Sequence, residues 1–394
     1  MSTRVIVHVG PRKTGTTYLQ RVLQKVAAEP GFNGVLYPLA YRNHNHHNHA
    51  HAAFAIENLA DQGADIVWDE FGTDEDTHPA LIRAVNRHEG VSIVSSEALG
   101  GFRPEAVGMF LEGITGEIQV IVTARDIGRI FPSSWQQHLR NTHAPDYAAF
   151  LERRAVEREL GPDQWNARRT LRFWRSYSYG NLVRRWEQFV GVGSVSVITV
   201  PPVGGTGDSL WERFRTACDL RAELPDVAPP IAPLAANTGS TEAEATFLLA
   251  FNNLARELDF SRRDVKRMIR RLLDTGILNR VDRGRPLLLP GAHLERVQRW
   301  AREDIADLAQ TGAPIFGALD ELIVHKDEST ESPLDPDEVA AVGAHIAMQL
   351  LQEKVGRAPR GNRATRSVKG LLRSLQGKGD RFARGHRVPH HIQR

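Results

Sequence analysis

The stretch VIVHVGPRKTGTTYLQ, residues 5–20, decides how this chain folds. Its first half is an apolar run that ends in glycine, which is typical of a buried parallel strand. From residue 14 to about residue 28, apolar side chains recur at helical spacing. The order of strand, glycine-rich turn and helix predicts a phosphate-binding loop, because a helix start offers backbone N–H groups and a positive dipole end to an anion.

The position of the lysine separates this loop from a nucleoside triphosphate site. Such a site carries lysine directly after its second glycine, but Thr16 stands there and Lys13 lies inside the loop. A triphosphate site also needs a metal ion, held in part by an aspartate at a strand end. Here the strand VIVTARD places Arg125 before Asp126. A P-loop kinase therefore lacks two of its parts and is kept only as an alternative.

Further strands and helices alternate along the first half of the chain, which predicts an α/β protein: a P-loop three-layer fold with a parallel central sheet. Strand patterns occupy 91–99, 118–126 and 194–202, and helical patterns occupy 103–114, 127–140 and 181–190.

After a proline-rich stretch at 225–239, helical patterns dominate. They occupy 241–258, 262–275, 293–311 and 334–354. We therefore expect a P-loop core at 1–224, a helical C-terminal section at 225–355 packed on that core, and a disordered basic tail at 356–394.

Composition restricts the class of protein. Of the 394 residues 41% are hydrophobic, Cys218 is the only cysteine, and no run of about 18 apolar residues occurs. The first residues lead straight into a strand pattern, so we expect no signal peptide and a cytoplasmic protein. Residues 357–394 carry eleven Arg or Lys against one acid, a net charge of +10, which leaves −7 of the overall +3 on residues 1–356.

The segment PRKTGTT (11–17) resembles the 5′-phosphosulfate loop of sulfotransferases that use 3′-phosphoadenosine 5′-phosphosulfate (PAPS). The pattern of that family is Pro-x-Lys-[Ser/Thr]-Gly-Thr-Thr, with the lysine inside the loop. The segment ARDIGRIFPSSW resembles the second motif of the family, an arginine at a strand end followed eight residues later by a serine. Similar segments at 95–100, 184–202 and 301–322 extend the resemblance to bacterial sulfotransferase-like proteins.

The resemblance implies which residues contact the nucleotide. The expected cofactor-binding residues are Arg12, Lys13, Thr14, Gly15, Thr16 and Thr17 in the loop, and Arg125 and Ser133 around the 3′-phosphate. Backbone N–H groups of the loop and the hydroxyls of Thr16 and Thr17 are the expected donors. The amine of Lys13 is expected to neutralise the departing oxygen. No metal is required.

Transfer to a hydroxyl or amine also needs a general base. Glu97 lies near the end of the strand pattern at 91–99, at the sheet edge where parallel sheets bind ligands. The alternative is a histidine from the segment YRNHNHHNHAHAAFA (41–55). The resemblance favours His51 there, and His44, His46, His47 and His49 lie in the same segment. Which of Glu97 and this cluster is the base stays open at this point.

The resemblance favours a glycoside or glycolipid as the acceptor, without identifying it. Few aromatic residues alternate with the charges of the tail, so a specific nucleic-acid module is not expected. Contact of the tail with an anionic membrane or an acidic partner is a hypothesis. A second alternative to a sulfotransferase is a non-catalytic nucleotide-binding protein of the same fold.

Overall fold

The computed structural model describes residues 4–29, 34–38, 49–60, 76–142, 145–202, 207–226, 228, 239–277, 280, 283–326, 329–330 and 334–355. The chain divides into two compact units, residues 1–239 with 287–332 and residues 240–286 with 333–394. The expected C-terminal section at 225–355 therefore contributes residues to both units. The expected basic tail at 356–394 and His44, His46 and His47 lie outside the described residues.

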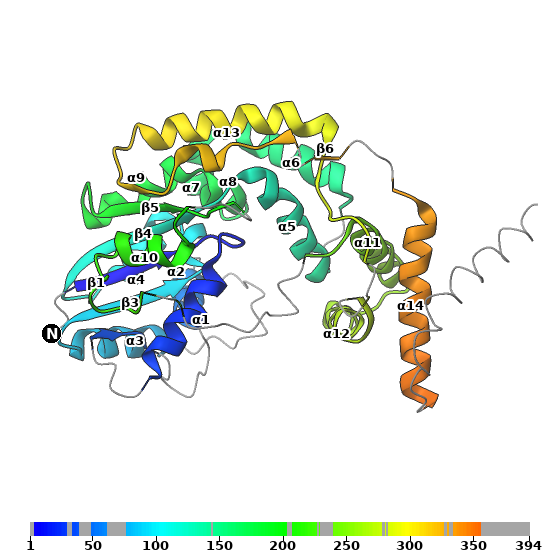
Figure 1. Ribbon diagram of the computed structural model, residues 1–394, viewed down its shortest axis with the longest axis horizontal. Helices are drawn as coiled ribbons and strands as arrows, with labels where there is room; N and C mark the ends of the chain where they lie inside the picture. Colours follow the sequence, from blue (N-terminus) through cyan, green and yellow to red (C-terminus); the bar gives the residue numbers. More distant parts are fainter. Residues whose placement is uncertain are drawn as a thin grey trace, which may run out of the picture. The chain divides into compact units, whose positions relative to one another are not determined.

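A six-stranded parallel sheet organises the first unit, which confirms the predicted α/β class (Figure 1). Its strands lie in the order β2-β3-β1-β4-β5-β7. Their bounds are β1 (Arg4–Val9), β2 (Val35–Leu36), β3 (Val91–Ser96), β4 (Glu117–Ala124), β5 (Val195–Thr199) and β7 (Ile315–Phe316). Two short strands, β6 (Leu289–Pro290) and β8 (Ser329–Thr330), form a separate parallel pair.

Helices of the first unit are α1 (Thr16–Ala27), α2 (Ala50–Ala60), α3 (Thr77–Arg87), α4 (Pro104–Leu111), α5 (Ile127–Arg140), α6 (Tyr147–Glu159), α7 (Gly161–Ala167), α8 (Arg172–Tyr177), α9 (Tyr179–Val190), α10 (Leu210–Ala217) and α13 (Leu294–Ala309). Short 3-10 turns are η1 (Leu99–Gly101), η4 (Gly291–His293) and η5 (Leu319–Leu322). None of the helices in the described part of the chain is long and apolar enough to cross a membrane.

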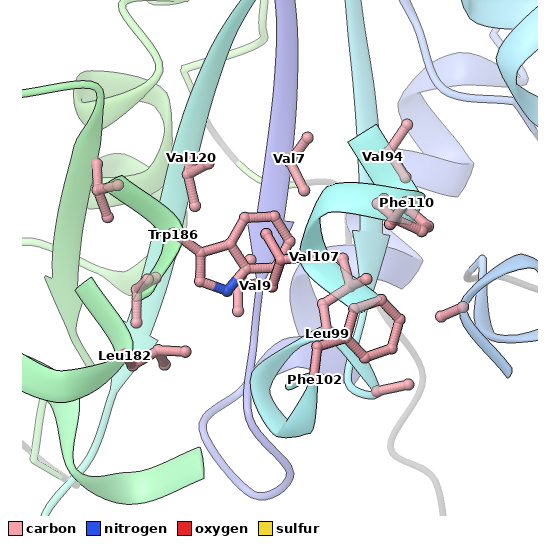
Figure 2. Close-up of a cluster of buried hydrophobic side chains, with 14 of the residues drawn as sticks. Val7, Val9, Val94, Leu99, Phe102, Val107, Phe110, Val120, Leu182 and Trp186 are labelled. Atoms are coloured by element: carbon pink, nitrogen blue, oxygen red, sulfur yellow. The ribbon is translucent and has the colours of Figure 1, made fainter. Parts of the chain in front are cut away.

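Successive side chains of a strand point to opposite faces of the sheet, and apolar side chains on both faces form two cores. On β1, Val5, Val7 and Val9 pack with side chains of α2, α3, α4 and α9, whereas Ile6 packs with side chains of α1 and α10. Figure 2 shows the first of these cores, with Trp186 of α9 lying among the valines of the strands. The sheet is thus covered by helices on both faces, as a buried parallel sheet requires.

The register of the three central strands sets where the functional loops begin. Val9, the last residue of β1, is level with Ser96 of β3 and with Val122 of β4. The loop after β1, the turn after β3 and the residues after β4 therefore leave the sheet side by side, at its carboxyl edge. Ligands of parallel α/β sheets bind at this edge.

The second unit contains α11 (Glu242–Glu257), α12 (Arg262–Leu272), the π-helical turn η3 (Leu273–Ile277) and α14 (Pro336–Val355). Thr241 and Glu244 form a capping box at the start of α11. The same Glu244 is fully buried and forms ion pairs with Arg283 and Arg280. These contacts hold Arg280 and Arg283 against α11.

Replacing Trp186 by alanine is expected to lower the free energy of unfolding by about 3–5 kcal/mol, because a fully buried indole leaves a cavity in the core. Chemical denaturation followed by circular dichroism measures this change. Val192→Ala, just beyond the same helix and 87% exposed, is the control and is expected to change it by no more than about 0.5 kcal/mol. Equal effects of the two substitutions would contradict this account of the core.

Candidate functional site

The loop between β1 and α1 has the close backbone geometry of an anion cradle. A Cβ atom at Gly10 would meet the Thr16 side chain at 2.2 Å, and one at Gly15 would meet Leu210 at 2.5 Å. Gly15 also has a φ of 81°, in the left-handed region that favours glycine. It directly precedes α1, so the loop presents its N–H groups together with the positive end of the helix dipole.

Two of the threonines in this loop hold the loop itself together. The Thr14 hydroxyl donates to the carbonyl of Pro11 at 2.6 Å and lies 2.8 Å from the hydroxyl of Thr123 on β4. The Thr16 hydroxyl donates to the carbonyl of Gly10 at 3.0 Å. Both side chains are buried. The turn thus uses the Thr16 hydroxyl to close on itself, and its role as a donor to a ligand stays a prediction.

Lys13 has an unusual backbone conformation for a residue with a side chain. Its φ is 72°, a region that costs a non-glycine residue about 1 kcal/mol or more. The carbonyl of Lys13 accepts a hydrogen bond from Nη1 of Arg125 at 3.0 Å. The two residues that the sequence assigned to opposite ends of a nucleotide are thus directly bonded, and this bond helps to hold Lys13 in its strained conformation.

Arg125 follows β4, and its main chain is fixed on both sides. Its N–H donates to the hydroxyl of Tyr179, and its carbonyl accepts from that hydroxyl, both at 2.9 Å. The next residue, Asp126, caps α5 by accepting a hydrogen bond from the N–H of Arg129 at 2.8 Å. Ser133 lies half-buried on α5. The start of α5 therefore lies directly after Arg125 in the chain.

Asp126 does not have the surroundings of a metal ligand. Its carboxylate is 1% exposed and accepts from both the backbone and the side chain of Arg129. That contact also engages the side chain of Arg129. Among the described residues, no cluster of His, Cys, Asp and Glu has the makings of a metal site.

Glu97 lies at the loop, as expected from the strand order. Its Oε1 accepts a hydrogen bond from the Thr17 hydroxyl at 3.2 Å, and its Oε2 is 3.9 Å from Nε of Arg12. The carboxylate is therefore beside the cations of the loop and partly open to solvent. A carboxylate in this position can accept a proton from a group held over the loop.

The histidines of the 41–55 segment separate into different roles. His49 is buried; its Nδ1 accepts from the N–H of Ser95 at 3.0 Å, and its Nε2 bonds to the carbonyl of Pro38 at 2.7 Å. Burial lowers the pKa of His49 to about 4. Its low pKa and its two backbone partners disfavour His49 as the base. His51 lies in the first turn of α2 and is 5% exposed.

Several cations converge on the loop and change the ionisation of Lys13. Burial of its amine lowers its pKa to about 8, and the nearby guanidinium of Arg140 acts in the same direction. The Glu97 carboxylate opposes this change, while Arg12 and Arg125 add to it. A cluster of like charges around a partly desolvated amine favours an anionic ligand, because such a ligand relieves the repulsion.

Sequence reasoning missed Arg140, Tyr177 and Tyr179. A signal for Arg140 is present, because it lies seven residues after Ser133 and therefore on the same face of α5. Tyr177 and Tyr179 carry no such signal. Their roles depend on contacts with Arg12 and Arg125, which are 165 and 54 residues away along the chain.

Among solved structures, the chain is similar to a sulfotransferase from Alicyclobacillus acidocaldarius, with a TM-score of 0.35 and 17% sequence identity. The match covers 68% of this chain and 96% of that chain. No protein-family model matches the chain, and no curated protein matches it either. The assignment of the site therefore rests on the residues and contacts described above.

The pKa of Lys13 predicts that anion binding is linked to proton uptake. With the pKa at about 8, the amine is charged at pH 7 and mostly neutral at pH 9, whereas a bound phosphate raises this pKa. Binding of 3′,5′-diphosphoadenosine should then take up close to no proton through Lys13 at pH 7 and about one at pH 9. Calorimetric titration in buffers of different ionisation enthalpy measures the uptake.

Lys13→Arg is the control, since arginine stays charged at both pH values. The difference between the two proteins removes the contribution of the ligand's own phosphates. Identical uptake at pH 9 would show that the Lys13 amine is not beside the bound anion.

Proposed function

We propose that this chain is a sulfotransferase that moves a sulfuryl group from PAPS to a hydroxyl or amine acceptor. The observation that carries the proposal is the hydrogen bond between Lys13 and Arg125, which we call the two anchors: Arg125 Nη1 donates to the carbonyl of Lys13 at 3.0 Å. This pair suits a nucleotide with a phosphate group at each end, because the lysine lies in the loop after β1 and the arginine follows the neighbouring strand β4. The resemblance of PRKTGTT and ARDIGRIFPSSW to the family motifs supports the same function.

The loop fits the 5′ end of such a nucleotide. Its amides and the start of α1 provide donors and positive potential for the 5′-phosphosulfate, and the amine of Lys13 neutralises the oxygen that leaves sulfur. Thr17 adds a half-buried hydroxyl. Arg125 and Ser133 serve the 3′-phosphate, because guanidinium binds phosphate through two parallel hydrogen bonds.

Bound PAPS would supply the activated sulfuryl group and the leaving phosphate. We assign Glu97 as the general base that takes the proton of the attacking hydroxyl or amine. Its contacts with Thr17 and Arg12 support this role, because they hold the carboxylate beside the loop where Lys13 lies. Arg172 bonds to Glu57 of α2 and to the carbonyl of Ala98, the residue after Glu97. This contact ties α2, the helix that contains His51, to the turn that carries Glu97.

We propose a small-molecule or glycan acceptor, a glycoside or glycolipid. That preference rests on the family resemblance. The proposals of a cytoplasmic location and of contact between the basic tail and an anionic membrane or an acidic partner rest on the sequence alone.

The main alternative, a P-loop kinase, is disfavoured by Asp126. Its carboxylate is committed to the α5 cap and to Arg129, so the strand-end aspartate that a nucleotide-bound Mg²⁺ requires is missing at this position. A non-catalytic nucleotide-binding protein would keep the anchors and lack transfer.

Nucleotide preference tests the proposal. By calorimetry, 3′,5′-diphosphoadenosine should bind at least about tenfold more tightly than ATP with Mg²⁺, and chelation of divalent metals should leave its affinity unchanged. A metal-dependent preference for ATP would sink the proposal in favour of a kinase. Transfer of label from ³⁵S-PAPS into an extract of the host organism then separates a transferase from a binding protein.

The role of Glu97 can be tested in the same transfer assay. Glu97→Gln should lower the single-turnover rate by about 10²- to 10⁴-fold, the usual contribution of a general base. The affinity for 3′,5′-diphosphoadenosine should change by no more than about threefold, since the amide keeps the size of the side chain. Glu105→Gln, on the exposed first turn of α4, is the matched control and should retain the full rate. A normal rate for Glu97→Gln combined with a large loss for His51→Ala would transfer the role to His51.

A further inference from the structure

Two buried tyrosines connect the loop after β1 to the residues after β4. Tyr177 ends α8 and Tyr179 begins α9, with Ser178 between the two helices. Tyr177 is 6% exposed and Tyr179 is 3% exposed. Both hydroxyls bond to backbone groups of residues assigned to the nucleotide site, so we name residues 177–179 the tyrosine clamp.

Each tyrosine serves a different anchor. The Tyr177 hydroxyl donates to the carbonyl of Arg12 at 2.9 Å, directly before Lys13. The Tyr179 hydroxyl accepts from the N–H of Arg125 and donates to its carbonyl. The last residue of β4, Ala124, is still bonded to the neighbouring strand through the N–H of Val200. Val200 directly follows β5, and Tyr179 bonds to the backbone of Arg125, the next residue after Ala124.

These contacts close a ring. It runs from Tyr177 to Arg12, along the chain to Lys13, through the Arg125 side chain to the Arg125 backbone, and back through Tyr179 and Ser178. Every hydrogen bond in the ring is 2.9 or 3.0 Å long. Buried hydrogen bonds hold their partners in a fixed geometry, because a lost partner leaves an unsatisfied group in a medium of low dielectric.

We propose that the tyrosine clamp sets the separation of the two anchors and so makes the site selective for adenine nucleotides that carry a 3′-phosphate. This inference rests on the proposed function and deepens it. Tyr179 acts as a positioning residue for Arg125, and Tyr177 acts as a positioning residue for the loop. Neither tyrosine contacts the reacting atoms.

The state of the two phenols suits this role. Burial raises the pKa of both Tyr177 and Tyr179 above the ordinary value for tyrosine. They stay protonated at neutral pH, as donation to the carbonyls of Arg12 and Arg125 requires. The two tyrosines line a small cavity together with Arg125 and with residues of α13, namely Ala301, Asp304 and Ile305.

The test compares two nucleotides that differ only in the 3′-phosphate, 3′,5′-diphosphoadenosine and adenosine 5′-monophosphate. Tyr179→Phe removes one hydroxyl and keeps the ring. It should weaken binding of the diphosphate by about tenfold, because both hydrogen bonds that fix the Arg125 backbone are lost. Binding of the monophosphate should change by less than about twofold, so the ratio of the two dissociation constants falls. Tyr177→Phe should weaken both nucleotides by a similar factor and leave the ratio unchanged.

Tyr147→Phe is the matched control. This tyrosine stacks on Trp135, and its hydroxyl is buried with no hydrogen-bond partner among the described residues. Its removal should leave both affinities unchanged. In the Arg125→Ala background, Tyr179→Phe should have no further effect on the ratio, because the positioned side chain is gone.

The ratio distinguishes positioning from a general loss of structure, which would weaken both nucleotides together. If Tyr179→Phe leaves the ratio at its wild-type value while wild type prefers the diphosphate, the clamp inference is overturned and the proposed function stands. If wild type shows no preference for the diphosphate, both are overturned.

Discussion

The hydrogen bond from the Arg125 guanidinium to the carbonyl of Lys13 is the contact on which the site depends. It joins the loop after β1 to the residues after β4, and it lies where the order β3-β1-β4 brings three strand ends together. Because the strands are parallel and in register, Glu97, Lys13 and Arg125 reach the same edge without any long connection. The strand order thus brings the three residues close together, and the hydrogen bond from Arg125 to the carbonyl of Lys13 fixes the position of the loop relative to the residues after β4.

The charges around this contact are poorly balanced without a ligand. Arg12, Arg125 and Arg140 all disfavour the charged form of Lys13, and Glu97 is the carboxylate that opposes them. This arrangement stores electrostatic repulsion, which an anionic ligand removes on binding. An anion with two phosphate groups removes more of it than an anion with one. Contacts of Thr14, Thr16 and Tyr177 hold the loop, so the proposed nucleotide site is organised without a ligand.

The sequence predicted the parts of the site better than their contacts. The apolar run at 4–9, the helical spacing after Gly15 and the strand before Arg125 follow from local periodicity, and the structure confirms all three. Local patterns do not record which way a hydroxyl turns. Thr14 turns toward Thr123, a residue 109 positions away, and that contact depends on the packing of β1 beside β4.

The histidine segment shows the same limit. Nothing in its composition identifies His49 as the histidine that bonds to the backbone of Ser95 and Pro38, because those contacts depend on the fold. The tyrosine clamp shows this limit more strongly. From the sequence alone, Tyr177 and Tyr179 look like ordinary aromatic residues of a core. Arg140 is different. Its spacing from Ser133 predicts that both lie on one face of the helix, but its proximity to Lys13 could not be predicted from the sequence.

The position of β7 in the sheet has a consequence for how the chain is made. β7 pairs with β5 through Val197 and Ile315, although more than a hundred residues separate them and the helices α11 and α12 of the second unit come between. During synthesis, β5 is therefore an open sheet edge until the ribosome has released Phe316. A nascent chain that ends within the second unit would therefore still have β5 as an open edge, to which another strand could pair.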